Sequence, residues 1–366
     1  MNAIPRTGRD SAATIAFLNS WTDDPVEGSG TTVAIQQLEW GLGALGHRVR
    51  VFPRRERLER SKVGRILYNI RVLSYLRRER FDAVLGFDLD GFLVPRGAVD
   101  RYLVSLKGIA ADEARYERRG VRRLLRMRAC LERANTSHAD RTLVTSEYCR
   151  RVARETYGLS DDVLAVVPEC IDLDAWRAMA AADPPPRDPR PTILHVAHQY
   201  PRKDTGTLLK AISLLRHEYP DVQLRLVGVG PRLRFLRKRA EELDLRGNVR
   251  FLGAIRDRLR LMQHYFEADL FCLPSRQEGF GIVFLEAMAA GLPVVAARAG
   301  AAPEVIGDGE AGLLFEPGDA VELKNRLSQL LGDAELRRAL SEAARERVQR
   351  YERRHVAMAF LQALGI

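Results

Sequence analysis

The chain alternates between short apolar runs and longer segments in which apolar residues recur at helical spacing. Residues 14–18 form an apolar run of strand length, and Leu38, Leu42 and Leu45 then recur at helical spacing. Residues 49–52 form the next apolar run. This order predicts a strand, a helix and a second strand, a βαβ unit that begins a doubly wound parallel sheet.

Similar apolar runs continue along the chain, with helical stretches between several of them. They lie at residues 83–85, 103–105, 143–144, 163–167, 192–196, 224–227, 249–252, 270–273 and 293–297. Residues 182–191 separate the two groups of runs and contain five prolines, which cannot continue a helix or an interior strand. The pattern therefore predicts two α/β domains, residues 1–183 and 192–350, joined by a proline-rich linker at residues 184–191.

Composition narrows the class of protein. A chain of 366 residues fits two domains of ordinary size. No apolar run approaches the roughly 20 residues that cross a bilayer, and the polar start lacks a signal-peptide core. The four cysteines are scattered, which argues against a disulfide framework or a zinc site. We expect a cytoplasmic protein with reduced thiols.

The net charge of +10 is shared by both halves, about +5 each, so the chain has no basic tail. Arginines instead crowd two stretches of the first half, residues 54–65 and 115–128. Such stretches bind phosphates, an acidic acceptor or an anionic membrane surface, which would make the protein membrane-peripheral. They also occur as solvated helix faces. We do not expect nucleic acid as a partner, because the charge is not organised as an arm or a tail.

The densest candidate chemistry lies at residues 275–286, directly after a predicted strand and leading into a predicted helix. Gly279 and Gly281 permit unusual backbone angles and close approach of a ligand. Amides at the start of the helix, with its positive dipole end, suit a diphosphate. Glu278 and Glu286 bracket the turn and suit the hydroxyls of a sugar and a ribose. Each carboxylate taken alone is equally consistent with a loop or solvated helix residue.

This segment resembles the E-x7-E motif of retaining glycosyltransferases of the GT-B fold, particularly their family 4. Further matches follow the family's order on both sides of the motif, and the resemblance covers nearly the whole chain. They are residues 228–231, 248–253, 268–271, 291–295, 303–305 and 312–314. The resemblance implies two Rossmann-like domains that face a central cleft, with residues 351–366 packing back across them as a helix. The amino-terminal domain would take the acceptor and the carboxy-terminal domain the donor.

The resemblance also implies roles for individual residues. Glu278 would contact the transferred sugar and Glu286 the nucleotide ribose, while amides of the turn would approach the sugar and phosphates. Lys203 matches the lysine that neutralises the diphosphate. The residues expected to bind the donor besides these are Arg202, His198, Gly279, Phe280, Gly281 and two glycines of the amino-terminal loop, Gly28 and Gly30.

Several positions depart from the family pattern. His198 stands where an arginine is usual, and an imidazole is the weaker diphosphate partner. Lys107 stands where many relatives carry a histidine; it either contacts the sugar or phosphate as a catalytic residue or is a solvated lysine. Glu169 and Cys170 replace an asparagine and a glycine. These departures leave donor choice open.

Two other patterns carry less weight. Residues 41–46 spell GxGxxG but end a helix, which is the reverse of the context for dinucleotide binding. Asp88 and Asp90 spell the DxD with which other sugar transferases bind a metal. We interpret both aspartates as loop residues and expect no metal.

The sequence thus predicts a retaining, metal-independent glycosyltransferase that needs no cofactor beyond its nucleotide-sugar donor. Its acceptor would be a glycan, a lipid-linked sugar or a small molecule. By resemblance, the leaving phosphate would help deprotonate the acceptor hydroxyl on the same face of the sugar. Two alternatives remain: a weakened protein that binds a nucleotide sugar without turnover, and a sugar-nucleotide epimerase.

Overall fold

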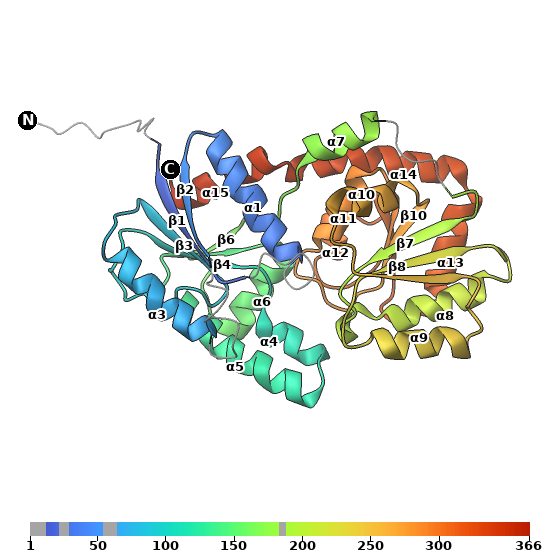
Figure 1. The fold of residues 1–366 in the computed structure, drawn as a ribbon, viewed down its shortest axis with the longest axis horizontal. Coiled ribbons are helices and arrows are strands. Elements are labelled where there is room, and N and C mark those ends of the chain that lie inside the picture. Colours follow the sequence, from blue (N-terminus) through green and yellow to red (C-terminus); the bar gives the residue numbers. More distant parts are fainter. Residues whose placement is uncertain (1–11, 22–28, 54–63, 183–187) are drawn as a thin grey trace, which may run out of the picture.

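The computed structural model describes residues 12–21, 29–53, 64–182 and 188–366. Their strands form two six-stranded, wholly parallel sheets, which confirms the predicted pair of doubly wound domains (Figure 1). The first sheet has the order β2-β1-β3-β4-β5-β6. Its strands are β1 (Thr14–Asn19), β2 (Arg48–Pro53), β3 (Ala83–Phe87), β4 (Tyr102–Leu106), β5 (Arg141–Val144) and β6 (Leu164–Val166).

The second sheet has the order β12-β11-β10-β7-β8-β9. Its strands are β7 (Thr192–Val196), β8 (Gln223–Val227), β9 (Val249–Gly253), β10 (Leu270–Leu273), β11 (Val294–Ala297) and β12 (Gly312–Phe315). The order reverses between β7 and β10, and ligands of open α/β sheets bind beyond the carboxyl ends of strands at such a point. The loops after β7 and β10 carry Lys203 and Glu278.

Helices cover both faces of the first sheet. On one face, α1 (Ser29–Ala44) packs with α15 (Arg353–Leu364), and Ile35 and Phe360 share a core with Phe17 of β1. On the other face lie α3 (Gly64–Leu76), α5 (Arg119–Thr136) and α6 (Glu147–Tyr157). Two short elements, α4 (Ala110–Glu113) and a 3-10 turn at Ala114–Tyr116, precede α5. The last helix of the chain therefore belongs to the core of the first domain.

Helices also cover both faces of the second sheet. One face holds α8 (Thr205–Leu215), α9 (Leu233–Glu242) and α13 (Ala320–Gly332). The other holds α10 (Arg258–Phe266), α11 (Ile282–Ala289), α12 (Ala302–Ile306) and α14 (Ala334–Arg347). Helix α7 (Leu173–Ala181) precedes the proline-rich segment, and its Trp176 is buried in this second core. Residues 184–187 of the predicted linker lie outside the described residues.

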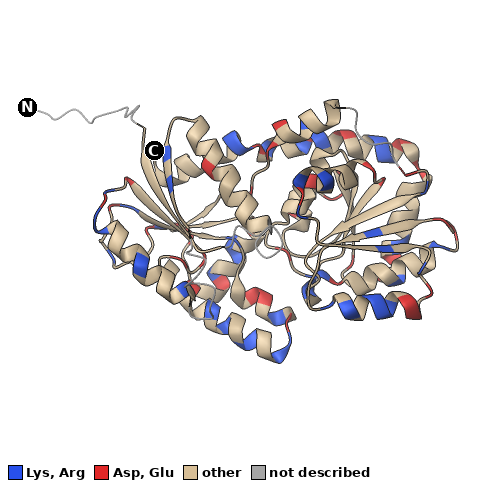
Figure 2. Cartoon of the chain, in the orientation of Figure 1, with Lys and Arg blue, Asp and Glu red and all other residues tan. Residues whose placement is uncertain are grey.

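Within the described parts of the chain, no helix combines the length and apolar composition that a membrane span requires. Charged residues of both signs are spread over the helices of both domains (Figure 2). The arginine-rich residues 54–63 lie outside the described residues, whereas those from Arg115 to Arg128 are described and lie on or next to α5.

Candidate active site

The site is built where the glycine turn of the second domain meets the first domain. Strand β10 is buried along its length, and the chain after it turns through Gly281, whose φ of +89° favours glycine, into α11. A Cβ at Gly281 would lie 2.6 Å from the ring of Phe284, so a side chain here would collide as well as strain the backbone. The turn therefore presents backbone amides rather than side chains at the start of α11.

The first domain holds this turn through three side chains of the segment that begins α6. The Gly279 carbonyl accepts hydrogen bonds from Ser146 Oγ at 2.6 Å and Thr145 Oγ1 at 3.2 Å, and the Cys149 thiol lies 3.2 Å away. Burial raises the pKa of the Cys149 thiol to about 11, so it is a protonated donor near neutral pH. The carboxy-terminal motif is thus docked on the amino-terminal domain.

Lys203 and Glu278 form a buried ion pair beside the turn. Lys203 ends the 3-10 turn Pro201–Lys203, and its ammonium contacts Glu278 Oε1. The side chains are 13% and 9% exposed. Burial lowers the pKa of Lys203, and Glu278 opposes that shift. Burial raises the pKa of Glu278, but Lys203 and Arg202 together outweigh it and leave that pKa below its usual range.

Arg202, the neighbouring cation, spans the two domains. Its guanidinium pairs with Glu113 of α4 at 3.2 Å and lies 5.1 Å from the ring of Tyr200. Arg202 Nε is buried and has no hydrogen-bond partner among the described residues. The sequence predicted Arg202 as a diphosphate ligand; the structure places it next to Lys203 but with its charge shared by Glu113.

His198 lies in the loop between β7 and Lys203. Burial lowers its pKa, and the nearby Lys203 lowers it further. The imidazole is therefore neutral near pH 7 and adds no charge to the site. His195, which sequence reasoning did not single out, is fully buried in β7, with Nδ1 2.9 Å from the Cys272 carbonyl oxygen.

Two further glycines let the backbone pack closely behind this loop. Gly228 and Gly230, after β8, have φ values of +119° and +155°. A Cβ at Gly228 would lie 2.0 Å from the Ala197 carbonyl oxygen. The loops after β7 and β8 therefore pack backbone against backbone at the carboxyl edge of the sheet.

Glu286 lies on α11, one to two turns after the glycine turn. Its Oε2 accepts a hydrogen bond from the Tyr265 hydroxyl at 2.6 Å. Burial raises the pKa of Glu286, and the Tyr265 bond opposes that shift. The tyrosine fixes the orientation of the carboxylate that the sequence predicted for the ribose.

On the amino-terminal side, Lys107 follows β4 and is not a solvated lysine. Its ammonium pairs with Glu169 at 2.8 Å, and the two side chains are 7% and 9% exposed. A Cβ at Gly279 would lie 3.6 Å from the Lys107 carbonyl oxygen, so this segment borders the glycine turn. The two departures from the family pattern, Lys107 and Glu169, thus pair with each other.

The DxD carboxylates are both fully buried and occupied by donors of the protein. Asp88 accepts from the Lys107 amide at 2.9 Å and from Trp21 Nε1 at 3.0 Å, and it pairs with Arg128 at 2.9 Å. Asp90 accepts from the amide and the hydroxyl of Ser20, each at 2.7 Å. These aspartates hold the loop after β1 and the start of the Lys107 segment in place.

The glycine-rich loop before α1 is described only in part. Gly28 lies outside the described residues, whereas Gly30 lies in the first turn of α1. A Cβ at Gly30 would lie 3.4 Å from Ile282 at the start of α11. Gly30 was predicted to lie in the loop before this helix; it instead lies within α1, whose start packs against the start of α11 across the domains.

Glu304 makes a contact between the domains that sequence reasoning missed. Its two carboxylate oxygens accept from the amides of Glu147 and Tyr148, at 2.9 and 3.1 Å. These amides open α6, where the helix dipole favours a negative charge. Glu304 lies in α12 of the second domain, so it ties that domain to the helix that docks Gly279.

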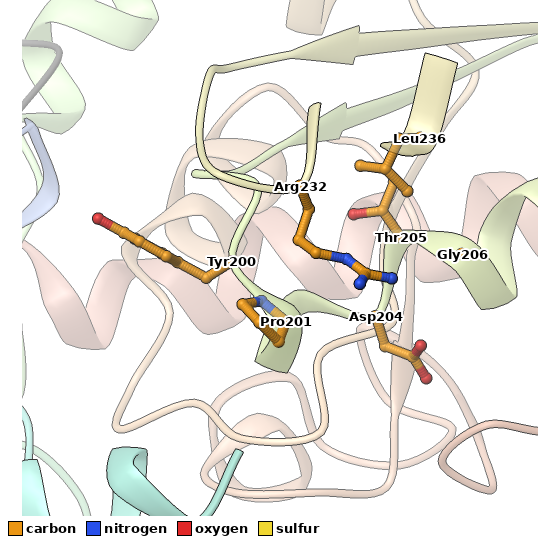
Figure 3. Close-up of a pocket in the computed structure, with 7 residues that line it drawn as sticks. All are labelled: Tyr200, Pro201, Asp204, Thr205, Gly206, Arg232 and Leu236. Carbon is orange, nitrogen blue, oxygen red and sulfur yellow. The ribbon is translucent and has the colours of Figure 1, made fainter. Parts of the chain in front are cut away.

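A small pocket opens beside the turn that carries Lys203 (Figure 3). It is lined by Tyr200, Pro201, Asp204, Thr205, Gly206, Arg232 and Leu236. The Arg232 side chain extends over the start of α8, and its guanidinium lies 3.8 Å from the ring centre of Phe235. The pocket keeps one side of the Lys203 turn accessible. Among the described residues, no group of three or more metal-ligating side chains is gathered.

Two family models match this chain, one over most of the first domain and the other over most of the second. The model of the family described as Glycosyltransferase Family 4 matches residues 28–175, and that of Glycosyl transferases group 1 matches residues 180–347. A GDP-mannose-dependent alpha-(1-6)-phosphatidylinositol monomannoside mannosyltransferase of Mycolicibacterium smegmatis is 33% identical over 223 residues. The match covers 57% of each chain, so this chain spans little more than half the length of that relative.

Solved structures match over nearly the whole chain. Sucrose-phosphate synthase from Thermosynechococcus elongatus has a TM-score of 0.82 at 24% identity and covers 96% of this chain and 98% of its own. HepE of Anabaena, solved with UDP and glucose, has a TM-score of 0.73 at 20% identity over 96% of this chain and 99% of its own. At these identities the likeness establishes the fold.

Proposed function

Because the chain belongs to the group 1 glycosyltransferases of the GT-B fold, we propose that it transfers a sugar from a nucleoside-diphosphate sugar to an acceptor hydroxyl. The observation that carries the proposal is the buried pair of Lys203 and Glu278 beside the amides of the glycine turn. This arrangement brings a cation, helix-terminal donors and a carboxylate side by side, from two loops that lie 75 positions apart in the chain. The acceptor is a glycan, a lipid-linked sugar or a small molecule.

Donor binding would use these groups in a defined order along the ligand. Lys203 and the amides after Gly281 would hold the diphosphate, with Arg202 adjacent and the neutral His198 serving as a hydrogen-bond partner. Glu278 would accept from sugar hydroxyls and Glu286 from the ribose. The named relative uses GDP-mannose and HepE was solved with UDP, so the family accommodates more than one nucleobase.

Catalysis would depend on stabilising the departing diphosphate. When the bond between the sugar's anomeric carbon and the phosphate oxygen breaks, its electron pair stays on that oxygen. The fixed charge of Lys203 compensates the new negative charge in a site with little water. The acceptor oxygen bonds to the anomeric carbon on the same face and its proton passes to the phosphate oxygen. The anomeric configuration is therefore retained.

No metal or organic cofactor enters this proposal. The two cations, Lys203 and Arg202, and the start of α11 supply the positive charge that a metal provides elsewhere. The DxD carboxylates are already bonded to Trp21, Ser20 and the Lys107 amide. Chelation with EDTA is expected to leave turnover unchanged, and loss of turnover that returns with added Mg²⁺ or Mn²⁺ would contradict a metal-independent reaction.

The acceptor wall would be formed by the first domain. The Lys107 ammonium, held by Glu169, borders the turn at Gly279, so it lies on the side of the cleft opposite the donor domain. We propose that it acts on the sugar or phosphate from that side. Substitution of Lys107 by methionine should lower kcat more than it raises the KM for the donor.

The test is a thermal-shift panel of UDP, GDP, ADP and their sugars, followed by release of the nucleoside diphosphate with candidate acceptors. A stabilising donor identifies itself by mass action. Glu278→Gln should abolish release, whereas Glu241→Gln, an exposed change on α9, should not. If the chain bound a donor but released no nucleoside diphosphate with any of the acceptors, a non-catalytic binding protein would be favoured. Conversion of the donor sugar without acceptor would favour an epimerase.

A further inference from the structure

Two helices of the first domain present apolar side chains to solvent. On α5, the exposed fractions of Val121, Leu124 and Met127 are 47%, 65% and 61%, and Leu124 is the most exposed of the large apolar residues described. On α3, Ile66, Leu67 and Ile70 are 45%, 42% and 55% exposed. Single exposed apolar residues are ordinary, but groups that share a helix face mark an interaction surface.

Both helices lie on the same side of the first sheet. Their inner residues, Tyr68 of α3 and Ala129 of α5, pack into one core cluster. The ring of Trp21 lies between them, 5.1 Å from the Arg65 guanidinium and 5.3 Å from that of Arg128. In Figure 1, α3 and α5 lie along the lower edge of the first domain, with the start of α5 toward the second domain.

The charge on α5 is almost entirely positive. The helix carries six arginines, at positions 119, 122, 123, 126, 128 and 133, and one acid, Glu132, which is buried. Arg119, Arg123 and Arg126 are exposed and form no ion pair within the described ranges. In Figure 2, α5 carries several blue segments along its length.

We propose that the outer faces of α3 and α5 dock on an anionic lipid bilayer. A helix with arginines around exposed leucine, valine and methionine lies in the membrane interface, with its apolar side chains among the acyl chains and its cations at the phosphates. This surface is separate from the Lys203–Glu278 site, so the inference goes beyond the proposed transfer reaction. It also places the acceptor side of the cleft near lipid, since Arg128 of α5 pairs with Asp88, which holds the Lys107 amide.

The same observations disfavour two other occupants. A second copy docked through α5 would bring the cations Arg119, Arg123 and Arg126 against each other, because α5 itself carries no exposed acid. Nucleic acid would use the arginines but gain nothing from Leu124 and Met127, which are more than half exposed. A bilayer surface satisfies both the charge and the apolar groups.

The test is co-sedimentation of the full chain with vesicles of phosphatidylcholine alone and of phosphatidylcholine with 30–40% phosphatidylglycerol (about the range that gives a strongly negative surface). The wild-type chain should bind the anionic vesicles and lose most of that binding in high salt. Arg123→Gln/Arg126→Gln should lower the partition coefficient about 10- to 30-fold, because each arginine near such a surface contributes about a factor of five. Leu124→Ser/Met127→Ser should lower binding at both low and high salt.

The matched control is Arg234→Gln/Lys238→Gln on α9, which removes the same charge from an exposed helix of the second domain. It should bind vesicles like the wild type. Equal losses in both charge variants, or no loss in the α5 variants, would overturn the proposal. The proposal would also be overturned if the α5 variants lost binding to duplex DNA or RNA but bound vesicles as the wild type does. Donor-induced thermal shifts should persist in all variants, which separates failure of this proposal from failure of the proposed function.

Discussion

Replacing Lys203 by methionine separates the two roles that the structure gives to its ion pair with Glu278. The methionine keeps the apolar stem and removes the ammonium, so the Glu278 carboxylate, 9% exposed, loses its nearest cation. Breaking a buried pair in this way costs about 3–5 kcal/mol of unfolding free energy. Because Arg202 also lowers the pKa of Glu278, we expect a loss near the lower end, about 3 kcal/mol.

The double variant Lys203→Met/Glu278→Gln removes the unpaired charge along with the pair. Its cost should fall to about 1–2 kcal/mol, the cost of an imperfectly bonded neutral amide. The double variant should therefore be about 1–2 kcal/mol more stable than Lys203→Met alone, so the two losses should not add. Urea unfolding followed by circular dichroism, at pH 7 and constant ionic strength, measures all three variants on one scale.

Donor affinity should behave differently from stability. A hydrogen bond to a charged group contributes about 1.5–3 kcal/mol, so loss of Lys203 should weaken nucleoside-diphosphate binding roughly 10- to 150-fold. The double variant should regain stability but not affinity. Lys210→Met, an exposed change on α8 with the same change in charge, should alter neither. Additive stability losses, or undiminished diphosphate binding by Lys203→Met, would refute the assignment of this pair.

Three further predictions follow from the site. Burial lowers the pKa of His195 from 6.5 to about 4, so the unfolded chain takes up a proton at a higher pH than the folded chain does. The free energy of unfolding should therefore fall by on the order of 3 kcal/mol as the pH drops through that interval. His195→Gln should reduce this pH dependence in urea titrations at pH 7 and 4.5. Tyr265→Phe removes the bond that opposes the raised pKa of Glu286, so donor affinity should fall several-fold and fall further at pH 6 than at pH 8 in calorimetric titrations. Ser146→Ala removes the 2.6 Å bond to Gly279 and should weaken donor binding by a factor of about five, whereas Ser137→Ala at the exposed end of α5 should leave it unchanged.

The sheets could be predicted from the sequence because their strands are buried on both faces. Strands of this kind are continuous apolar runs, and β3, β10 and β11 are each buried throughout. Residues 351–366 were harder to place, because helical periodicity does not say which domain a helix covers. The packing of Phe360 with Phe17 of β1 follows from tertiary contacts between opposite ends of the chain.

The site could be predicted only where a local motif marks it. The E-x7-E spacing locates Glu278 and Glu286, and resemblance adds Lys203, which the structure places against Glu278 although 75 positions separate them. No local pattern predicts that Glu304 caps α6 or that Glu113 pairs with Arg202. These contacts join residues far apart in the chain, and each partner taken alone has the composition of an ordinary surface residue.

Lys107 and Glu169 are two departures from the family pattern that compensate each other, because they form one ion pair. A lysine in the place of a neutral histidine puts a full charge in a buried position, which is costly without a partner. The glutamate that replaces an asparagine supplies that partner at 2.8 Å, and the pair is neutral overall. Reverting either residue alone would leave a buried charge unpaired, whereas reverting both would not. The ammonium is held by Glu169 and the backbone amide of the same residue by Asp88, so its position is fixed from two sides. In the proposed reaction, Lys107 would therefore act as a cation already paired with an anion, where a neutral histidine would offer a hydrogen bond.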